Sequence, residues 1–192
     1  MQAAAAIQAS ETFNARARAE GWPSLCDPEL AFTDTRFRVL LSLWHGFAVG
    51  DRTPRRSDFT PRALKALLRN VAIYERVANG TVRYRVRVMG SAFADVMGDL
   101  SGRFIDEAVP PAFAPRWHAA LDAAFEAHAP LRFIGRSDTA NKSYLVAEFF
   151  EAPLIDDNGA AMVLAAGYFA PRPWMQVGAA EAESIPRAAA AE

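Results

Sequence analysis

The stretch VAIYERVANGTVRYRVRVMGSAFADVMGDLSGR, residues 71–103, decides how the rest of the chain is arranged. Apolar and polar side chains alternate on both sides of Asn79-Gly80. Asn-Gly suits the positive φ angles of a two-residue type I′ turn, so the alternation predicts a β-hairpin. With Asn79 and Gly80 as the loop, the opposed pairs would be Val77 with Val82, Glu75 with Tyr84, Ile73 with Val86, and Val71 with Val88.

This register divides the hairpin into two faces. One face is apolar except for Glu75, while the other carries three arginines and must meet water, a polar partner or a covering segment. The arginines are Arg83, Arg85 and Arg87. Residues 92–97 then begin a short helix that Gly98 can close. Gly98 and Gly102 supply backbone freedom at the two ends of a tight loop whose Leu100 points inward.

Composition narrows the class of protein. With 192 residues and 52% hydrophobic content, the chain can form one domain with a sizeable core. A net charge of −1 argues against a protein that coats nucleic acid or an anionic membrane. The single cysteine, Cys26, cannot form an intramolecular disulfide. No apolar run reaches the roughly 20 residues that span a bilayer, and the start lacks the basic region of a signal peptide, so we expect a cytoplasmic protein.

Outside the hairpin, the chain divides into four parts. Residues 1–32 are Ala-rich and have no sustained apolar stripe, so they are predicted to be a largely irregular tail with a frayed helix at most over 10–19. Residues 33–60 are predicted to be an N-terminal helix and linker, and residues 61–171 the folded core. Residues 172–192 are predicted to be an Ala-rich C-terminal tail.

The N-terminal helix has one wide apolar stripe, and Thr33 or Asp34 can cap it. The stripe consists of Phe37, Leu40, Leu41, Trp44 and Phe47. Two interpretations stay open at this point. The helix either packs as a core helix on the domain, or it covers a sheet face or pairs with its copy in a homodimer.

Beyond the hairpin, the pattern predicts a helix over 113–128 and strands over 131–136, 143–154 and 162–169. A short helix after Pro61 is also predicted, with Leu64, Leu67 and Leu68 facing inward. Short connections imply antiparallel neighbours, and the helices between the second and third strands must lie on one face of the sheet. The predicted fold is therefore α+β, with a five-stranded antiparallel sheet, short helices on one face and an N-terminal helix.

The order β-β-α-α-α-β-β-β resembles that of PAS domains, and the chain is similar to the single-module PAS-like family widespread in alphaproteobacteria. The resemblance covers about residues 34–170. It is carried by Trp44, the linker at 56–61, Met89-Gly90-Ser91-Ala92, the loop at 98–103, and Glu148 with Pro153-Leu154. Glu151 departs from the aliphatic or basic residues typical of the family there. The resemblance implies a PAS fold and a sensory role in signal transduction.

No pattern in the chain indicates catalysis. The histidines, His45, His118 and His128, have no Cys, Asp or Glu at ligand spacing, and no Gly-x-Ser-x-Gly elbow occurs, so neither an enzyme nor a metal site is predicted. The resemblance would allow haem through His118 or His128, but no second feature supports it and no cofactor is expected. The basic residues of 52–69 lack aromatic interleaving, so neither nucleic acid nor a membrane is an expected partner.

PAS-like sheets hold ligands, when they hold any, between the concave sheet face and the intervening helices. The resemblance and the hairpin register together imply a pocket with Glu75 as its polar group. Its lining would be Ile73, Glu75, Tyr84, Val86, Met97, Phe104, Trp117, Leu121 and Phe125. Alternatively Glu75 lies at a wet edge, because a buried carboxylate is costly unless it is hydrogen-bonded or neutralised.

Two functions follow as hypotheses. The leading one is a stand-alone PAS-type signalling module without an output domain, which acts in trans on a regulator such as a sensor kinase. Its interaction surface would consist of Phe37, Leu40, Leu41, Trp44, Arg83, Arg85 and Arg87. The alternative is a receptor whose main site is the pocket, with a small molecule as its ligand.

Overall fold

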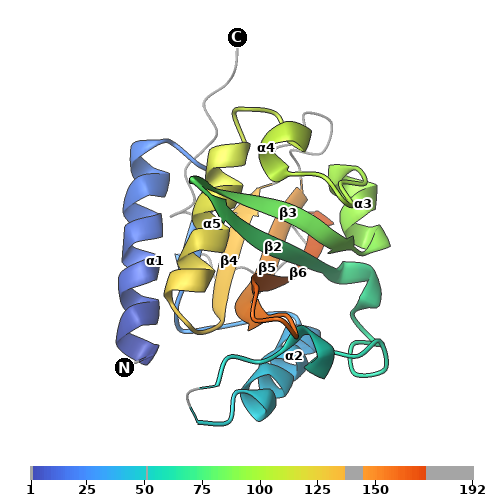
Figure 1. Ribbon diagram of the computed structural model, residues 1–192. Helices are drawn as coiled ribbons and strands as arrows, with labels where there is room; N and C mark the ends of the chain where they lie inside the picture. The colour runs from blue at the N-terminus through green and yellow to red at the C-terminus, as the bar shows by residue number, and fades with distance from the viewer. Residues whose placement is uncertain (1, 51, 137–144, 172–192) are drawn as a thin grey trace.

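The computed structural model describes residues 2–50, 52–136 and 145–171. Its middle layer is a six-stranded antiparallel sheet with the strand order β1-β4-β5-β6-β2-β3 (Figure 1). The strands are β1 (Ser24–Asp27), β2 (Val71–Asn79), β3 (Thr81–Met89), β4 (Leu131–Arg136), β5 (Leu145–Ile155) and β6 (Ala161–Pro171). The predicted α+β class is confirmed, but the sheet has six strands and not five, because β1 pairs with β4 at one edge.

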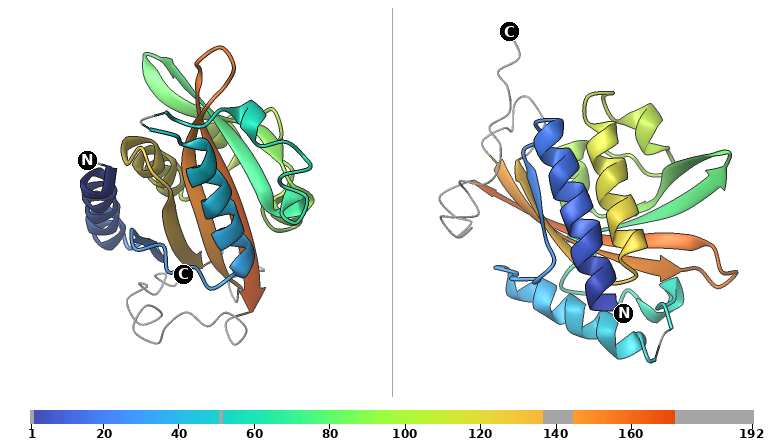
Figure 2. Two further views of the ribbon diagram at one scale, coloured as in Figure 1. Left: turned by 90° about the horizontal axis from the view of Figure 1, so that it is seen from below. Right: turned by 90° about the vertical axis from the view of Figure 1, so that its left-hand side faces the viewer.

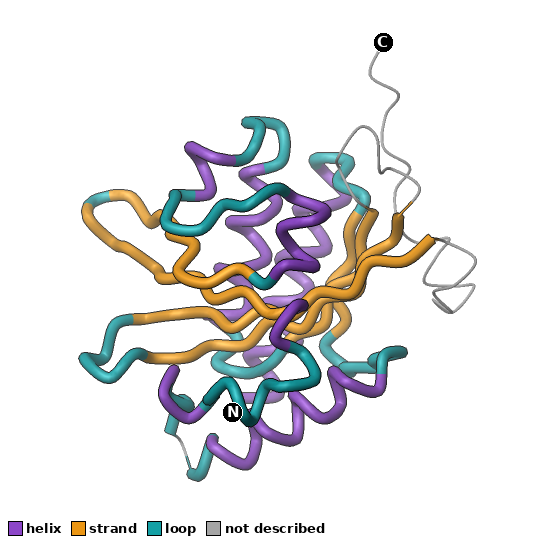
Figure 3. Tube along the Cα trace, turned by 90° about the vertical axis from the view of Figure 1, so that its right-hand side faces the viewer, coloured by secondary structure: helices purple, strands orange, loops and turns teal. Residues whose placement is uncertain are grey.

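Helices cover both faces of this sheet, as Figures 2 and 3 show. One side carries α1 (Gln2–Ala19), α3 (Ser91–Met97), α4 (Ile105–Ala108) and α5 (Ala114–Glu126). On the other side lies α2 (Thr35–Phe47). The helices between β3 and β4 thus share one face, as predicted. The chain is a three-layer sandwich in which α2 and α5 are separated by the sheet.

The prediction that residues 1–32 form an irregular tail is wrong. α1 packs along α5, and its buried residues Ala6, Ala9, Phe13 and Ala17 form one cluster with alanines of α5 and with Phe133. The ring centroids of Phe13 and Phe133 are 4.9 Å apart. The buried stripe of α1 is mostly alanine, so it gives little hydropathy contrast, although small side chains let two helices approach closely. This is why the sequence pattern did not reveal it.

α2 is a core helix that also covers one face of the sheet, so the structure combines the first interpretation with part of the second. The side chain of Asp34 caps it by accepting a hydrogen bond from the Arg36 amide. Phe37, Leu40 and Trp44 are buried against the sheet, and the indole N–H of Trp44 donates to the carbonyl of Pro153 at 3.0 Å. These three side chains therefore cannot form a homodimer contact in the folded chain.

The predicted hairpin exists, but its register is shifted. Arg76 lies opposite Tyr84 and Glu75 opposite Arg85, and a second shift follows between Ile73 and Tyr74. A shift of one residue moves every side chain of β3 to the other face relative to β2. Because of this shift, Glu75 meets arginines and not the buried Tyr84, which avoids placing a carboxylate in the core. The chain reverses direction between β2 and β3 at Gly80, which has a φ angle of +86°.

The loop after α3 has the predicted design. Gly98 and Gly102 have φ angles of +82 and +80, and Leu100 between them is buried. The amide of Gly102 donates to the carbonyl of Val86 at 2.8 Å, so the loop is fastened to β3. The single turn of α4 follows this loop and ends before Pro110.

A buried ion pair joins three strands to the start of α2. Arg132 of β4 donates from Nε to Glu148 of β5 at 2.7 Å and from a terminal nitrogen to Asp27 of β1 at 2.9 Å. Glu148 also accepts hydrogen bonds from the amide and hydroxyl of Thr33 and from the amide of Asp34. Arg132 and Glu148 are 1% and 0% exposed. Glu148, one of the residues on which the family resemblance depends, thus has a structural role.

Two smaller expectations are corrected. Turns over 61–67 and a 3₁₀ helix, η2 (Leu68–Asn70), replace the predicted helix after Pro61. Leu64 and Leu67 are buried as predicted, but Leu68 is 45% exposed. A 3₁₀ turn, η1 (Arg56–Asp58), occupies the predicted linker. The predicted C-terminal tail, 172–192, lies outside the described residues. Among the helices described, none combines the length and the hydropathy that crossing a membrane requires.

Candidate ligand-binding site

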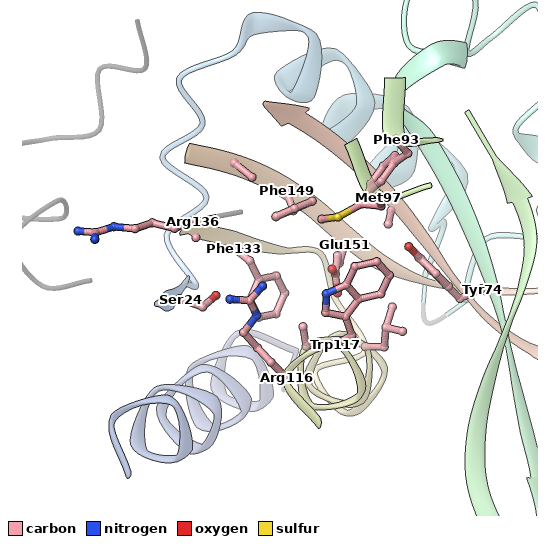
Figure 4. Close-up of a pocket in the computed structure, with 15 residues that line it drawn as sticks. Ser24, Tyr74, Phe93, Met97, Arg116, Trp117, Phe133, Arg136, Phe149 and Glu151 are labelled. Atoms are coloured by element: carbon pink, nitrogen blue, oxygen red, sulfur yellow. The ribbon is translucent and has the colours of Figure 1, made fainter. Parts of the chain in front are cut away.

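A cavity of about 50 Å³ lies between the sheet and the helices α3 and α5 (Figure 4). The lining residues come from the two helices and from five strands. The strands β1, β2, β4, β5 and β6 all turn alternate side chains toward α5. The lining residues are Ser24, Tyr74, Phe93, Met97, Arg116, Trp117, Ala120, Leu121, Phe133, Gly135, Arg136, Ala147, Phe149, Glu151 and Ala165. We call this space the Glu151 cavity.

Aromatic rings form much of its wall. Phe93 of α3 and Phe149 of β5 lie 6.0 Å apart between centroids. They approach the backbone of β6 so closely that a Cβ at Gly167 would lie 2.8 Å from Phe93 and 2.9 Å from Phe149. Glycine at this position therefore makes room for the two rings. Trp117 of α5 completes this part of the wall.

Glu151 is the polar group at the centre of the site. It lies on β5 between Leu131 and Ala165 of the neighbouring strands, and its residue surface is 8% exposed. Its Oε2 atom is buried and has no hydrogen-bond partner among the residues that the structure describes. Burial alone raises the pKa of Glu151 to about 8, so its carboxyl group is mostly protonated at neutral pH. Buried polar atoms without partners are rare in folded proteins and indicate water, a ligand or a functional role.

Two further polar groups face the cavity. Burial raises the pKa of the Tyr74 hydroxyl, and the negative charge of Glu151 raises it further, so this hydroxyl is a neutral hydrogen-bonding group. Burial lowers the pKa of Arg116 to about 10, which leaves the guanidinium charged at neutral pH. The hydroxyl of Ser24 already donates to the carbonyl of Ile134 at 3.3 Å. The site therefore offers a carboxyl, a phenol and a guanidinium within an otherwise apolar space.

The predicted pocket residues are divided between this cavity and other places. Met97, Trp117 and Leu121 line the cavity. Tyr84 and Val86 belong to the same buried cluster on that side of the sheet but lie outside the lining, and Tyr84 donates from its hydroxyl to Asp122 at 2.7 Å.

The remaining four predicted pocket residues are elsewhere. Ile73 packs on the α2 side of the sheet. Glu75 lies 3.5 Å from Arg87 and 4.0 Å from Arg85, outside the cavity, which corrects its proposed role as the pocket's polar group. Phe104 lies under the guanidinium of Arg83, and Phe125 under that of Arg76. The shifted register explains the positions of Ile73 and Glu75, since it decides which side chains of β2 face α5.

Sequence reasoning missed Glu151, Tyr74, Phe93 and Phe149 as site residues. The signal for Glu151 was present, because Ala147, Phe149 and Glu151 alternate on one face of a strand whose other face is apolar apart from Glu148. Glu151 was also the residue that departed from the family pattern. The alternation alone could not show which face of β5 meets α5.

Haem ligation through a histidine has no support in this geometry. His118 lies on α5 with its ring edge against Tyr84 at 5.5 Å between centroids, and it does not line the cavity. Pockets for drug-sized ligands are usually about 300–1,000 Å³, so a cavity of about 50 Å³ has no room for a macrocycle. Within the described ranges, no cluster of three His, Cys, Asp or Glu could hold a metal ion.

The predicted interaction surface is also divided. Phe37, Leu40 and Trp44 are buried and Leu41 is half-buried, so they form the inner face of α2. Arg83 pairs with Asp106 and Glu107 at 2.8 and 2.5 Å, while Arg85 and Arg87 lie near Glu75. The outer face of α2 instead exposes Val39, and Val49 follows just after the helix; these residues are 58% and 75% exposed.

Both the sequence and the fold of this chain are similar to those of known proteins. A family model described as PAS domain matches residues 33–168. An RNA-binding Light-Oxygen-Voltage receptor is similar in fold, with 15% identity and a TM-score of 0.38 over 62% of this chain and 36% of that chain. The light state of the blue-light photoreceptor Aureochrome1 LOV has 14% identity and a TM-score of 0.39 over 65% of this chain and 93% of that chain. The chain thus spans about a third of the first of these structures. No curated protein matches it significantly.

Proposed function

The chain belongs to the PAS domain family, a family of sensory signalling domains, and from this premise we propose that it senses a small molecule in the Glu151 cavity and passes the signal to a separate regulator such as a sensor kinase. The observation that carries the proposal is the buried Oε2 atom of Glu151, which lacks a hydrogen-bond partner within the described part of the chain. A ligand that donates a hydrogen bond there would satisfy the atom, and the apolar rings around it would exclude water.

Native mass spectrometry tests the binding part of this proposal. Wild-type protein purified from its own cells should carry an additional small mass that is lost on denaturation, and an absorption spectrum will show whether that mass is a chromophore. Ala120 lines the cavity from α5, where phenylalanine is compatible with a helix. Ala120→Phe should therefore fill the space and abolish the added mass. An added mass that persists in folded Ala120→Phe would place the ligand elsewhere.

The second part of the proposal, action in trans on a regulator, requires a protein interface. The exposed Val39 and Val49 favour it, because apolar side chains grouped on one side of a helix and its end often mark interaction sites. Leu43 and Phe47 are half-buried and extend this group. Arg87, whose side chain is 50% exposed, is retained from the predicted surface.

This interface is tested by measuring the affinity of a purified sensor kinase for three variants. Val39→Glu should weaken binding about tenfold or more, since a charge in an apolar contact is costly. Arg87→Glu tests the sheet surface, and Glu126→Gln on the exposed end of α5 is the matched control. If the kinase binds all three variants with equal affinity, neither the surface around Val39 nor that around Arg87 is the binding site. Light scattering will show whether a second copy of the chain is the partner.

A further inference from the structure

Resting on the proposed function, we propose that the Glu151 cavity is selective for a small organic ammonium ion that keeps at least one N–H group. The ion would donate a hydrogen bond to Oε2 of Glu151 and lie against the aromatic wall. This assigns a ligand class to a site for which the family alone indicates none.

The first support is that none of the described residues acts as a cationic partner of Glu151. Among the described residues, Tyr74 of β2 and Cys26 of β1 have their pKa raised first by burial and then by the charge of Glu151, and neither a phenol nor a thiol can carry a positive charge. Arg116 of α5 and Arg136 of β4 also line the cavity, but each has interactions of its own. Burial is the sole cause of the pKa shift of Glu151, so neither arginine neutralises its carboxylate. A ligand would have to supply the positive charge.

The second support is the character of the wall. Tyr74, Phe93, Trp117, Phe133 and Phe149 bring five aromatic rings to one small space, and Figure 4 shows them around Glu151. The faces of such rings attract organic cations, most strongly when both are shielded from water. A carboxylate among aromatic faces is therefore a suitable site for an ammonium group.

The third support is discrimination against other small molecules. An anion would meet the carboxyl group, and the two arginines that line the cavity, Arg116 and Arg136, already have interactions of their own. A neutral alcohol could satisfy Oε2 but would gain little from the rings. A quaternary ammonium has the charge but has no N–H to donate to Oε2. The cavity of about 50 Å³ further limits the ligand to a few heavy atoms.

Binding would release a proton. The ammonium group keeps its own proton and favours the carboxylate form of Glu151, so the proton of the Glu151 carboxyl passes to the buffer. With a pKa of about 8 in the free protein, about 0.9 of a proton would be released at pH 7 and about 0.1 at pH 9. The affinity for the ammonium ion should rise about ninefold between pH 6 and 7 and about fivefold between pH 7 and 8.

Isothermal titration calorimetry of the full chain tests the inference. Ethylammonium, ethanol and acetate serve as probes of matched size, each measured at pH 7 in two buffers of different ionisation enthalpy and again at pH 9. We expect ethylammonium to bind at least tenfold more tightly than either control, with the proton release given above. Tetramethylammonium should bind more weakly than ethylammonium.

Variants separate the carboxyl group from the wall. Glu151→Gln should lose at least tenfold in affinity for ethylammonium and release no protons. Glu75→Gln is the matched control, because Glu75 is a carboxyl on β2 outside the cavity, and it should behave as wild type. Trp117→Leu should lose several-fold in affinity while the proton release remains. Equal affinity of Glu151→Gln and wild type would overturn the inference.

The two levels of the proposal can fail separately. If ethanol or acetate binds and ethylammonium does not, the ligand class is wrong, but the cavity still receives small molecules. If none of the three probes binds to folded protein, the inference is overturned, and the native mass measurement on Ala120→Phe decides the proposed function by itself.

Discussion

Glu151 combines two properties that rarely occur together in a folded protein. It is an ionisable residue that is 8% exposed, and no described residue donates a hydrogen bond to its Oε2 atom. A buried carboxyl group without a donor destabilises the folded state in either protonation state, and more so when charged. Such a residue is expected where function requires it, as at a binding site.

The pH dependence of stability tests this description of Glu151. Its folded-state pKa of about 8 lies above the value of 4.5 for an unperturbed glutamate, so between these values the folded state binds a proton that the unfolded state has released. The free energy of unfolding should therefore fall as pH rises from about 4.5 to 8 and then level off, by up to roughly 5 kcal/mol. Urea denaturation at a series of pH values measures this dependence.

Glu151→Gln isolates the contribution of this carboxyl group. Glutamine stays neutral, so the variant should lose that part of the pH dependence and be more stable than wild type above pH 8. The difference between the two proteins cancels the other titrating groups, among them His118, whose pKa burial lowers. Parallel stability curves for the two proteins would show that Glu151 titrates normally.

Individual residues were the least predictable part of the site. Glu75 and Glu151 both occur in alternating strands, and the sequence shows no difference in their surroundings. The register of the hairpin decides whether Glu75 faces the cavity. The observed shift of one residue places it outside, beside Arg85 and Arg87. Register depends on the packing of whole faces, which local turn signals such as Asn79-Gly80 specify incompletely.

At the scale of elements, α1 is the main addition to the predicted fold. Its contact with α5 closes one side of the layer that contains the cavity, and β1 extends the sheet beneath it. Phe13 is 2% exposed and contacts both Phe133, which lines the cavity, and Trp22. The N-terminal segment is therefore part of the core.

Phe13→Ala tests this role of α1. Removing a buried phenylalanine leaves a cavity and should lower the free energy of unfolding by roughly 3–5 kcal/mol. Ile7→Ala on the same helix is the control, since Ile7 is 51% exposed and its loss should cost about 0.5 kcal/mol or less. Chemical denaturation measures both, and a small effect of Phe13→Ala would mean that α1 is detached in solution.

The ion pair of Arg132 and Glu148 connects elements that are far apart in sequence. Arg132→Met should destabilise the fold by roughly 3–5 kcal/mol, because it leaves a buried carboxylate without its cation. Arg69→Met is the matched control, since Arg69 and its partner Asp95 have side chains that are 75% and 69% exposed and an exposed pair contributes roughly 0–1 kcal/mol. Similar losses in the two variants would contradict the structural role of the buried pair.

For the whole molecule, the order and type of most elements followed from hydrophobic periodicity and turn residues. The short connections placed the helices between β3 and β4 on one face, and the match over residues 33–168 shows the PAS family that the sequence resembles. The edge strand β1 and the packing of α1 were not predictable, because four residues of strand and an alanine stripe give weak local signals. The cavity depends on all of these elements together, so its lining could be predicted only in part.

The layered arrangement also separates the two proposed functions in space. The Glu151 cavity lies on the α5 side of the sheet, and the exposed residues Val39 and Val49 lie on the α2 side. Strand β5 belongs to both sides, since Glu151 faces the cavity and Phe150 packs in the cluster beneath α2. A ligand that changes the charge of Glu151 would act on a strand that also supports α2.

The most direct test of this account is the ¹³C NMR signal of the Glu151 carboxyl group at pH 7, assigned by its absence in Glu151→Gln. The account predicts the chemical shift of a protonated carboxyl in the free protein and a change to that of a carboxylate when ethylammonium is added. A carboxylate shift in the free protein, or a signal that ethylammonium leaves unchanged, would contradict it.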